Sequence, residues 1–226
     1  MSRATTAPRT NTEDAAETTV FTDGACIDNG GENAAAGSGV WYTDNDPRNK
    51  SVQVPHEEQS NQTGELHAVL LAVRSHPPNG DLCIVSDSRY VIDGLTKHLR
   101  RREDRGWIDV QHSDLFQSIT AWMRWRNART RFRWVKGHSG NRGNEGADKL
   151  AGEGAKKPLP EQPDTPEHPQ NQLARGAKIC KLEQRDFYKI LRDKKKIPTR
   201  KRTERCRTWE KDWPIIGSNQ DQTSSQ

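Results

Sequence analysis

The sequence predicts an α/β fold in which helices cover a mixed β-sheet, and three observations predict it. Apolar runs of strand length alternate with amphipathic helical segments in the order β-β-β-α-β-α-α-β-α. Residues 82–87 (LCIVSD) are an almost uninterrupted apolar run, which is typical of a buried strand. Between residues 64 and 76, apolar positions recur at i, i+3, i+4 and i+7, which indicates a helix with one buried face.

The first half of the chain is expected to supply three strands and one helix. The strands are expected at residues 19–24, 37–43 and 51–54, and the turn-rich stretch DNDPRNK joins the last two. The helix at 64–76 is ended by Pro77-Pro78, because proline cannot continue a helix. The residues of its apolar face are Leu66, Val69, Leu70 and Val73.

The second half is expected to complete the sheet and its covering helices. The run at 82–87 is followed by a helix at 88–102, and a further helix at 113–129 begins at Ser113 as its cap. RFRWVK at 131–136 alternates in polarity as a strand does, and a last helix is expected at 144–154.

Composition divides the chain into four parts. Residues 1–18 are expected to be a disordered tail, 19–156 a catalytic domain, 157–172 a proline-rich extended linker, and 173–226 a basic extension. Within that extension, 173–192 is expected to form one basic helix, followed by a disordered end.

Positive charge is concentrated in the C-terminal extension. Residues 175–213 carry 15 Lys and Arg against 6 Asp and Glu, whereas the whole chain has 36 against 31, so the remainder is slightly acidic. A basic tail of this kind can tether nucleic acid, contact a protein partner, direct nuclear import or simply favour solubility.

The cysteines exclude some classes of protein. Four cysteines lie far apart, without the CxxC or Cys/His spacing of a zinc site and without a disulfide framework. No apolar run approaches the length of a membrane span, and the N-terminus lacks an apolar signal core. A soluble, intracellular protein is expected, with the nucleus as a possible destination because of the basic runs.

Four acidic residues carry the chemistry: Asp23 (FTDGAC), Glu65 (TGELHAV), Asp87 (IVSDSRYV) and Asp148 (GNEGADKLA). Three of them stand in apolar surroundings, where a carboxylate is unfavourable without a partner. Taken singly, Asp23 reads as a turn residue and Glu65 as a first-turn helix acid. Together they predict one site, and because clustered carboxylates repel unless a cation neutralises them, the site predicted is one for two Mg²⁺ or Mn²⁺ ions.

These segments resemble the type 1 ribonuclease H family. The motifs that carry the resemblance are TDGAC (22–26), NQTGEL (61–66), SDSRYVIDGLT (86–96) and WVKGHSGNRGNEGADKLA (134–151), in the family's order and spacing. The resemblance covers about Val20 to Ala155. It implies a five-stranded mixed sheet with helices on both faces, and endonucleolytic hydrolysis of the RNA strand in RNA/DNA hybrids, giving 5′-phosphate and 3′-hydroxyl ends.

The resemblance also implies roles for single residues. Asp23, Glu65, Asp87 and Asp148 match the family's metal-binding carboxylates, which hold two Mg²⁺ ions, with Mn²⁺ as a substitute. His138 matches the histidine of a mobile loop that handles the attacking water or helps product release, and Glu145 matches an acid beside the metal site. The positions expected to touch the minor groove of the hybrid are Cys26, Asn29, Asn61 and Gln62.

Residues 97–107 (KHLRRREDRGW) match the family's basic handle, which grips the DNA strand. The chain departs from the pattern, because His98 and Arg102 stand where tryptophans commonly occur. Contacts to phosphates therefore remain expected, while stacking contacts are in doubt. The handle residues expected to bind substrate are Lys97, Arg100, Arg101, Arg105 and Trp107. The protein is expected to be a monomer, and its C-terminal basic tail is expected to contact nucleic acid or a protein partner.

Two other functions remain open. One is a nucleic-acid-binding module with impaired catalysis, derived from a retroelement ribonuclease H domain; the altered handle and the Thr63-Gly64 pair before Glu65 favour it. The other is a DNA transposase or integrase of related fold, although those enzymes lack the GHSG loop paired with this helix acid. Binding of hybrid without cleavage would select the first, and strand transfer on duplex DNA the second.

Overall fold

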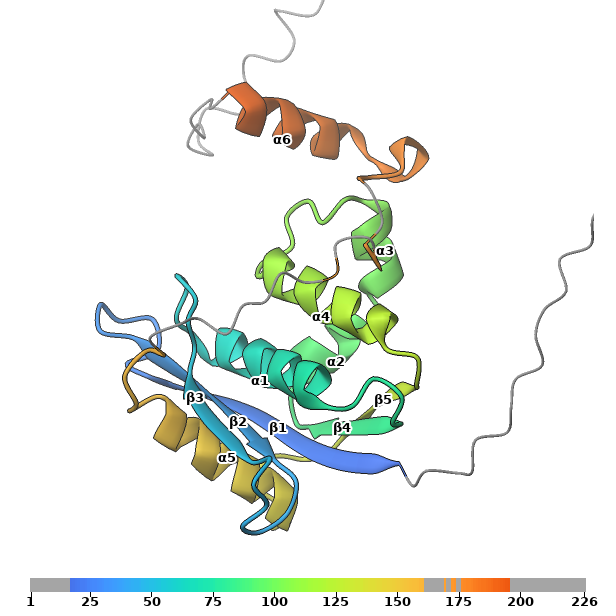
Figure 1. The fold of residues 1–226 in the computed structure, drawn as a ribbon. Coiled ribbons are helices and arrows are strands. Elements are labelled where there is room, and N and C mark those ends of the chain that lie inside the picture. The colour runs from blue at the N-terminus through green and yellow to red at the C-terminus, as the bar shows by residue number, and fades with distance from the viewer. Residues whose placement is uncertain (1–16, 161–168, 170–171, 174–175, 196–226) are drawn as a thin grey trace, which may run out of the picture. The chain divides into compact units, whose positions relative to one another are not determined.

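The computed structural model describes residues 17–160, 169, 172–173 and 176–195 (Figure 1). By its internal contacts the chain forms two compact units, Met1–Leu182 and Glu183–Gln226. The first unit holds the sheet and its helices. Residues 1–16, most of the expected linker and residues 196–226 lie outside the described residues, so the predictions of disorder made for them are not addressed.

The sheet is the centre of the first unit and has five strands in the order β3-β2-β1-β4-β5. β1 pairs antiparallel with β2, and β2 with β3, whereas β1–β4 and β4–β5 are parallel. The mixed five-stranded sheet predicted from the sequence is thus confirmed. The strands are β1 (Thr18–Ile27), β2 (Ala35–Trp41), β3 (Lys50–Gln53), β4 (Leu82–Ser86) and β5 (Thr130–Trp134).

Helices cover both faces of this sheet. Figure 1 shows α1, α2 and α4 on one face and α5 on the other. The main apolar core lies under α1, α2 and α4, where Leu66, Ile84 and Phe116 are fully buried. The helices of this unit are α1 (Asn61–Ser75), α2 (Arg89–Leu95), α3 (Leu99–Asp104), α4 (Ser113–Trp125) and α5 (Arg142–Gly154).

The start of α1 differs from the prediction. The helix begins at Asn61 instead of residue 64, because Ser60 accepts a hydrogen bond from the Thr63 amide at 3.2 Å while the Thr63 hydroxyl accepts the Ser60 amide at 2.8 Å. This reciprocal pair is a capping box in which Thr replaces the usual Glu or Gln. Glu65 consequently lies in the second turn, and its interpretation as a first-turn acid was wrong.

The prediction of a single helix at 88–102 was also wrong: the chain forms two helices there, α2 and α3. The amide of His98 bonds to the Asp93 carbonyl, five residues back, which closes α2 and redirects the chain. Gly94 in the last turn of α2 lies against the Phe116 ring, where a Cβ would overlap it. The turn therefore packs tightly on α4 and cannot extend straight into α3.

The helix predicted at 113–129 ends earlier, at Trp125. Arg126 takes extended backbone angles, and its buried guanidinium donates to the carbonyls of His76 (3.0 Å) and Gly80 (2.5 Å). These carbonyls belong to the connection between α1 and β4. The hydrogen bonds of a buried side chain thus outweigh continuation of the helix.

α5 lies directly on the backbone of β2. A Cβ at Gly37 would overlap the main chain at Ala151 of α5 and at its C-cap Ala155, and a Cβ at Gly39 would overlap the main chain at Ala147. The two glycines allow the helix to approach the strand more closely than side chains would permit. Gly39 is also the register partner of Asp23 on β1, so the contact links Asp23 to the turn of α5 that carries Asp148.

The prediction of one basic helix at 173–192 was wrong as well. The structure has a short 3₁₀ turn, η2 (Ile179–Lys181), in the first unit and a helix, α6 (Gln184–Lys195), in the second. Leu182 between them is extended, and the Asp186 carboxylate accepts the Glu183 amide at 2.9 Å, which starts α6 afresh. At the other end, Thr18 already belongs to β1 although it was assigned to the tail. No helix in the described part of the chain is both long and apolar enough to cross a bilayer.

Candidate active site

A pair of glycines brings Glu65 next to Asp23. Gly24 follows Asp23 on β1, and Gly64 precedes Glu65 on α1. A Cβ at Gly24 would overlap the Glu65 amide nitrogen, and one at Gly64 would lie 3.0 Å from the Cα of Gly24. The strand and the helix therefore meet backbone to backbone, which no other residue type would allow. This contact places Asp23 on β1 and Glu65 on α1 close to the point where the strand and the helix meet.

Asp23 is the most buried of the four acids, at 8% exposure. The pKa of its carboxyl is raised from 3.8 to about 8, chiefly because burial disfavours the charged form and next because of the negative charge of Asp87. A 2.8 Å hydrogen bond from the Gly24 amide opposes the shift, and the charges of Asp148 and Glu65 add to it. The charges of all three other acids thus raise the pKa of Asp23, and their convergence on one metal site stays a prediction.

Glu65 is held by a hydroxyl from the neighbouring element. Ser88 donates to its Oε2 at 2.5 Å, and the same hydroxyl accepts the Val91 amide at the start of α2. Burial raises the pKa of the Glu65 carboxyl, the Ser88 hydrogen bond lowers it, and the charge of Asp87 raises it further. Ser88 therefore fixes one oxygen of Glu65 and leaves the other available.

Asp87 directly follows β4, at the carboxyl end of a parallel strand. Its Oδ2 accepts a 3.1 Å hydrogen bond from the side-chain amide of Asn144, which is 2% exposed. Gly137 leaves room for this carboxylate, because a Cβ there would overlap Oδ2. Trp134 donates its indole N–H to the Asp87 carbonyl at 2.9 Å, which fixes the backbone behind the acid.

Asp148 completes the set from the middle of α5. Its Oδ2 lies 4.0 Å from Nδ1 of His138, whose side chain is 84% exposed. His138 has a positive φ of 48°, which is uncommon outside glycine and marks a tight loop between β5 and α5. Glu145, the predicted auxiliary acid, is exposed in the first turn of α5.

The donor set fits a hard divalent cation. Every predicted donor is a carboxylate oxygen, the kind of ligand that Mg²⁺ prefers. The pKa of the Asp23 carboxyl is raised chiefly by burial and next by the charge of Asp87, and a bound cation would favour the charged form of both acids. Within the described residues, no group of three or more His, Cys, Asp or Glu side chains is already gathered closely enough to hold a metal ion. The side chains would have to close around the ion.

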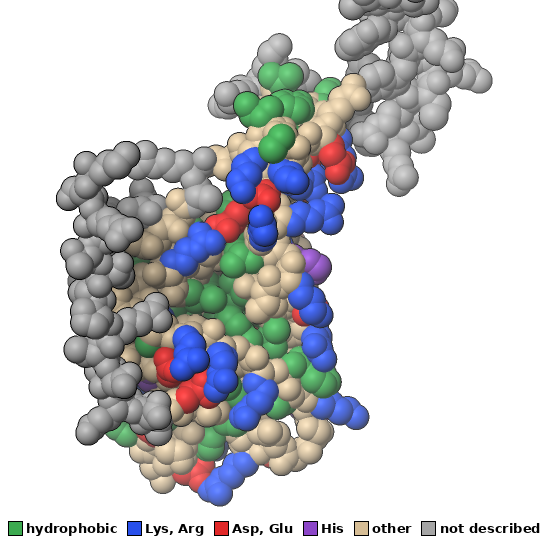
Figure 2. All heavy atoms as spheres, turned by 90° about the vertical axis from the view of Figure 1, so that its right-hand side faces the viewer, with side chains coloured by type: hydrophobic (Ala, Val, Ile, Leu, Met, Phe, Trp, Pro, Cys, Tyr) green, Lys and Arg blue, Asp and Glu red, His purple; other side chains and the backbone are tan. Residues whose placement is uncertain are grey.

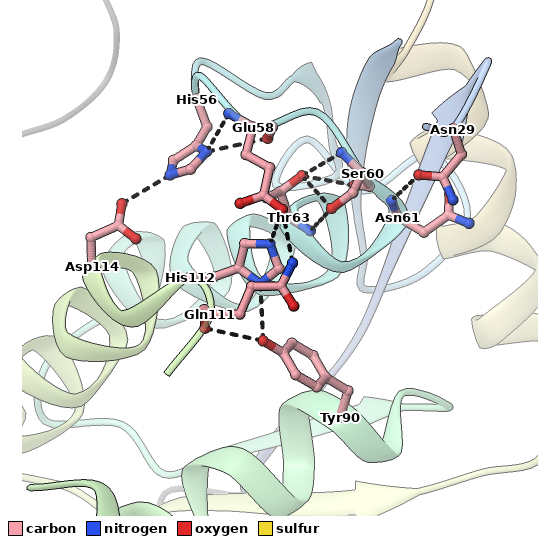
Figure 3. Close-up of polar contacts among 10 residues, drawn as sticks. All are labelled: Asn29, His56, Glu58, Ser60, Asn61, Thr63, Tyr90, Gln111, His112 and Asp114. Atoms are coloured by element: carbon pink, nitrogen blue, oxygen red, sulfur yellow. Dashed lines mark hydrogen bonds and ion pairs between the residues drawn. The ribbon is translucent and has the colours of Figure 1, made fainter. Parts of the chain in front are cut away.

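The four residues predicted to touch the hybrid lie on two neighbouring elements. Asn29, in the turn after β1, accepts the Asn61 amide at 3.4 Å, so the first turn of α1 and the β1–β2 turn adjoin (Figure 3). Both side chains are exposed. Gln62 is half-buried beside Asn61, and Cys26 is half-buried near the end of β1, where burial raises the pKa of its thiol.

The handle residues divide into exposed and inward-facing groups. Arg100 and Arg101 on α3 are exposed, and Lys97 is exposed with a 2.9 Å ion pair to Asp93. Arg105 is half-buried. Trp107 stacks against the core ring of Phe116, with centroids 6.4 Å apart, so most of its ring is engaged in packing.

Arg102 occupies one of the positions where the family commonly has tryptophan. Its guanidinium lies over the face of Phe116, 4.2 Å from the ring centroid, and its Nη1 is buried without a hydrogen-bond partner. Burial lowers the pKa of the guanidinium. Arg102 therefore packs on the Phe116 ring by a cation–π contact, at a position where the family commonly has tryptophan, and its guanidinium does not extend into solvent.

A polar cluster that sequence reasoning missed ties the loop before α1 to the start of α4 (Figure 3). Glu58 accepts from the Gln111 side-chain amide at 2.9 Å and lies 3.0 Å from Nε2 of the buried His112. The Gln111 hydrogen bond chiefly lowers the pKa of the Glu58 carboxyl. The residues of the cluster are His56, Glu58, Tyr90, Gln111, His112 and Asp114.

No sequence signal could have found these contacts, because the partners are separated by 21 to 58 residues. Ser88 and Asn144 were missed for a different reason. Each stands inside a motif that was singled out, but a serine or an asparagine near an acid is usually only a turn or cap residue. Their hydrogen bonds to Glu65 and Asp87 become visible only in three dimensions.

Proteins of known name are similar in sequence to this chain. The chain is 40% identical over 141 residues to a ribonuclease H of Schizosaccharomyces pombe, which covers 60% of this chain and 52% of the relative. It is 34% identical over 140 residues to a ribonuclease H of Alcanivorax borkumensis, covering 60% of this chain and 89% of the relative. The chain thus spans about half the length of the eukaryotic relative and most of the bacterial one.

A solved structure and a family model complete the comparison. The protease–reverse transcriptase of prototype foamy virus matches with a TM-score of 0.51 at 22% identity, over 65% of this chain and 22% of that one, which shows the shared fold. The model of the RNase H family matches residues 15–156, more than half of the chain and every acid of the site. The chain belongs to the ribonuclease H family.

Proposed function

We propose that this protein is an endonuclease that hydrolyses the RNA strand of RNA/DNA hybrids with two bound Mg²⁺ ions, for which Mn²⁺ can substitute, and that it leaves 5′-phosphate and 3′-hydroxyl ends. The observation that carries the proposal is the placement of the acids by neighbouring elements: β1 and α1 meet backbone to backbone between Asp23 and Glu65, and Asn144 of α5 donates to Asp87. Membership of the family supports the same activity.

The four carboxylates would hold the ions: Asp23, Glu65, Asp87 and Asp148. Bound Mg²⁺ supplies Lewis-acid polarisation of the scissile phosphate and of the attacking water. The protein's own groups do the rest. Ser88 and Asn144 orient Glu65 and Asp87, and burial of Asp23 excludes bulk water from one side of the site.

His138 and Glu145 would act at the solvent side of the site. The His138 imidazole is exposed and near Asp148, so it can exchange a proton with water that enters or with product that leaves. Its exposure and its position in a loop with positive φ suit a group that moves between substrate and solvent. Glu145 is one turn away on α5 and supports the same edge by its charge.

Selection of RNA over DNA would occur at the turn after β1. The Asn29 and Asn61 side chains can donate to and accept from a ribose 2′-hydroxyl, which DNA lacks. Cys26 and Gln62 flank them, and the handle cations Lys97, Arg100, Arg101 and Arg105 would contact phosphates. Trp107 would support the handle mainly by packing on Phe116.

A labelled-strand assay tests the proposal. RNA/DNA hybrid, duplex RNA, duplex DNA and a duplex with one embedded ribonucleotide are each incubated with Mg²⁺, with Mn²⁺ and with chelator. We expect cleavage of the RNA strand of the hybrid, dependence on the metal, and products that a 5′-phosphate-dependent exonuclease degrades. Cleavage in chelator, or of duplex DNA at a similar rate, would contradict the proposal.

Alanine at Asp23 or Asp87 should abolish cleavage with little effect on the circular dichroism spectrum. Full activity in either variant would remove the metal-site assignment. If the unmodified chain binds hybrid but never cleaves it with either metal, the protein is a binding module and the alternative function holds.

The remaining inferences concern assembly and location. We infer a monomer whose catalytic domain spans about residues 19–156, which light scattering and limited proteolysis would test. The runs KKK (194–196) and RKR (200–202) are candidates for nuclear import or nucleic-acid tethering. Fusion of residues 173–226 to a fluorescent reporter, with and without those cations, would distinguish import from a role confined to binding.

A further inference from the structure

The segment that follows the expected linker docks on the basic handle. We define residues 176–182 as the strap; it belongs to the first unit and contains η2. The Lys178 amide donates to the Asp104 carbonyl at 2.8 Å, and the Lys178 ammonium lies 2.7 Å from the Asp104 carboxylate. One residue of the strap therefore binds one residue of α3 through both main chain and side chain.

Packing reinforces this pair of contacts. Gly106, at the end of α3, has a positive φ of 64°, and a Cβ there would lie 2.8 Å from the Ala177 Cβ. The absent side chain leaves the space that Ala177 fills. Close by, Arg124 on α4 makes two hydrogen bonds of 2.6 and 2.7 Å to Glu103 and one of 3.2 Å to the Gln172 carbonyl.

These contacts change the charge of the handle. Glu103 and Asp104 are the two acids of α3, and both are paired with cations from outside that helix, namely Arg124 and Lys178. The pKa of the Asp104 carboxyl is lowered chiefly by the Lys178 hydrogen bond, and the charges of Arg100 and Lys181 lower it as well. Cations of the handle and the strap thus gather around a single carboxylate that no longer offsets them.

We propose that the strap and α3 form one phosphate-binding surface, in which Lys178 neutralises Asp104 and Lys181 extends the row of Arg100 and Arg101. Figure 2 shows Lys and Arg side chains spread along the face that carries α3 and β5. Arg100, Arg101 and Lys181 are all exposed. The occupant is the sugar-phosphate backbone of a nucleic-acid duplex, because a row of exposed cations binds phosphates without reading sequence or sugar.

This proposal rests on the proposed function for its substrate, but its test separates the two. Binding of the full chain to a hybrid and to duplex DNA of equal length is measured by fluorescence anisotropy in chelator, between 50 and 300 mM salt. Lys181→Ala should weaken binding to both duplexes about three- to tenfold at low salt. It should also reduce the slope of log K against log salt by about 0.9, the value for one phosphate contact.

A charge cycle tests the role of Lys178. Lys178→Ala should weaken binding more than Lys181→Ala, because it removes a cation and also exposes the negative charge of Asp104. Adding Asp104→Asn to Lys178→Ala should restore most of the lost affinity. If Asp104→Asn has no effect in that background, Lys178 acts in some other way and the surface proposed here is wrong.

Docking itself is read by hydrogen exchange of a peptide that spans the strap. Ala177→Trp, which cannot fit beside Gly106, should raise exchange at the Lys178 amide and lower affinity to the level of the Lys178→Ala variant. Lys156→Ala removes an exposed cation at the far end of α5 and is the matched control, with unchanged affinity expected.

The outcomes are distinct for the two proposals. If every strap variant binds both duplexes as the unmodified chain does, the strap proposal fails whatever the cleavage assay shows. If the chain cleaves no hybrid but the strap variants still lose affinity for both duplexes, the proposed function fails and the strap proposal stands. Where both hold, strap variants should raise KM and leave kcat unchanged.

Discussion

Asp23 is the residue whose protonation most clearly couples to stability. The pKa of its carboxyl is about 8 in the folded protein and near 3.8 when unfolded, so the folded state binds the proton more tightly. Its contribution to stability is therefore fully present below about pH 4 and is lost as pH rises toward 8. Without a divalent metal, the protein should be more stable in mild acid than in mild base as far as this group is concerned.

Asp23→Asn isolates that effect, because asparagine is nearly the same size and carries no charge. In chelator at pH 8–9 we expect the variant to be more stable than the unmodified chain by on the order of 2–4 kcal/mol, since the repulsive charge is removed. At pH 4 the difference should nearly vanish. Denaturant unfolding across that pH range checks the sign; an equal stability difference at both ends would contradict the raised pKa.

Ser88 is expected to act as a positioning residue for Glu65. Ser88→Ala removes the donor to Glu65 and the cap of α2, so a loss of about 1 kcal/mol of stability is expected from the cap alone. Misorientation of Glu65 should in addition lower kcat about 10- to 100-fold and raise the Mg²⁺ concentration for half-maximal rate.

Ser88→Thr is the matched control, because threonine keeps the hydroxyl and caps helices nearly as well. It should recover most of the rate and of the metal response. A lower melting temperature in Ser88→Ala, with unchanged kcat and Mg²⁺ response well below that temperature, would leave Ser88 with a structural role only.

At the scale of elements, the contact between β1 and α1 is expected to be intolerant of a single methyl group. Gly24→Ala would place a Cβ against the Glu65 amide and push the helix off the strand. Overpacking of this kind costs about 1–3 kcal/mol or more, and it would separate Asp23 from Glu65. We expect both lower stability and a loss of most cleavage activity.

Gly152→Ala supplies the comparison for that variant. Gly152 lies inside α5 and has no atom within 4 Å of an added Cβ. The same substitution there should stabilise the protein by about 0.5–1 kcal/mol and leave activity unchanged, because alanine favours a helix more than glycine does. Similar losses at both positions would mean that the glycine contact on β1 has no special importance.

The sequence predicted the elements well where periodicity or an apolar run was long, as in β4 and the middle of α1. It failed at their ends for identifiable reasons. The capping box of Ser60 and Thr63 lacks the usual Glu or Gln, so the start of α1 was placed too late. The break between α2 and α3 depends on Gly94 packing against Phe116, a contact between elements that no local pattern encodes.

In the candidate site, too, local sequence predicted some residues, whereas contacts that depend on the fold could not be predicted. The four acids could be predicted because each stands in a recognisable local context, while Ser88 and Asn144 act through hydrogen bonds that depend on the fold. Arg102 was noted only as a departure from a tryptophan, and its stacking on Phe116 follows from the packing of α3 on α4. Docking of the strap could not be predicted, because its partner Asp104 lies 74 residues earlier in the chain.

For the whole molecule, metal binding and folding should be coupled. A cation that binds only the folded state stabilises it by mass action, by about 2.7 kcal/mol when its concentration is 100 times its Kd. For a protein of this size, where 1 kcal/mol shifts the melting temperature by about 2–4 °C, we expect Mg²⁺ at that concentration to raise it by about 5–11 °C. NaCl at equal ionic strength should not reproduce the shift, and a double variant with Asn at Asp23 and Asp87 should abolish it.

The bare backbone of β2 under α5 has a consequence for how firmly the fourth acid is placed. Because main-chain atoms of α5 and β2 are in contact there, the distance of Asp148 from β2, the strand that pairs with Asp23 on β1, is set by atomic radii. The packing of side chains does not set it. Most helices shift by fractions of an ångström when core residues are substituted, but α5 cannot move closer to β2 because their main-chain atoms are already in contact. The distance between the Asp23 and Asp148 carboxylates should therefore stay constant when residues of the core on the opposite face of the sheet are substituted. A single added methyl group, as in Gly39→Ala on β2, should increase that distance.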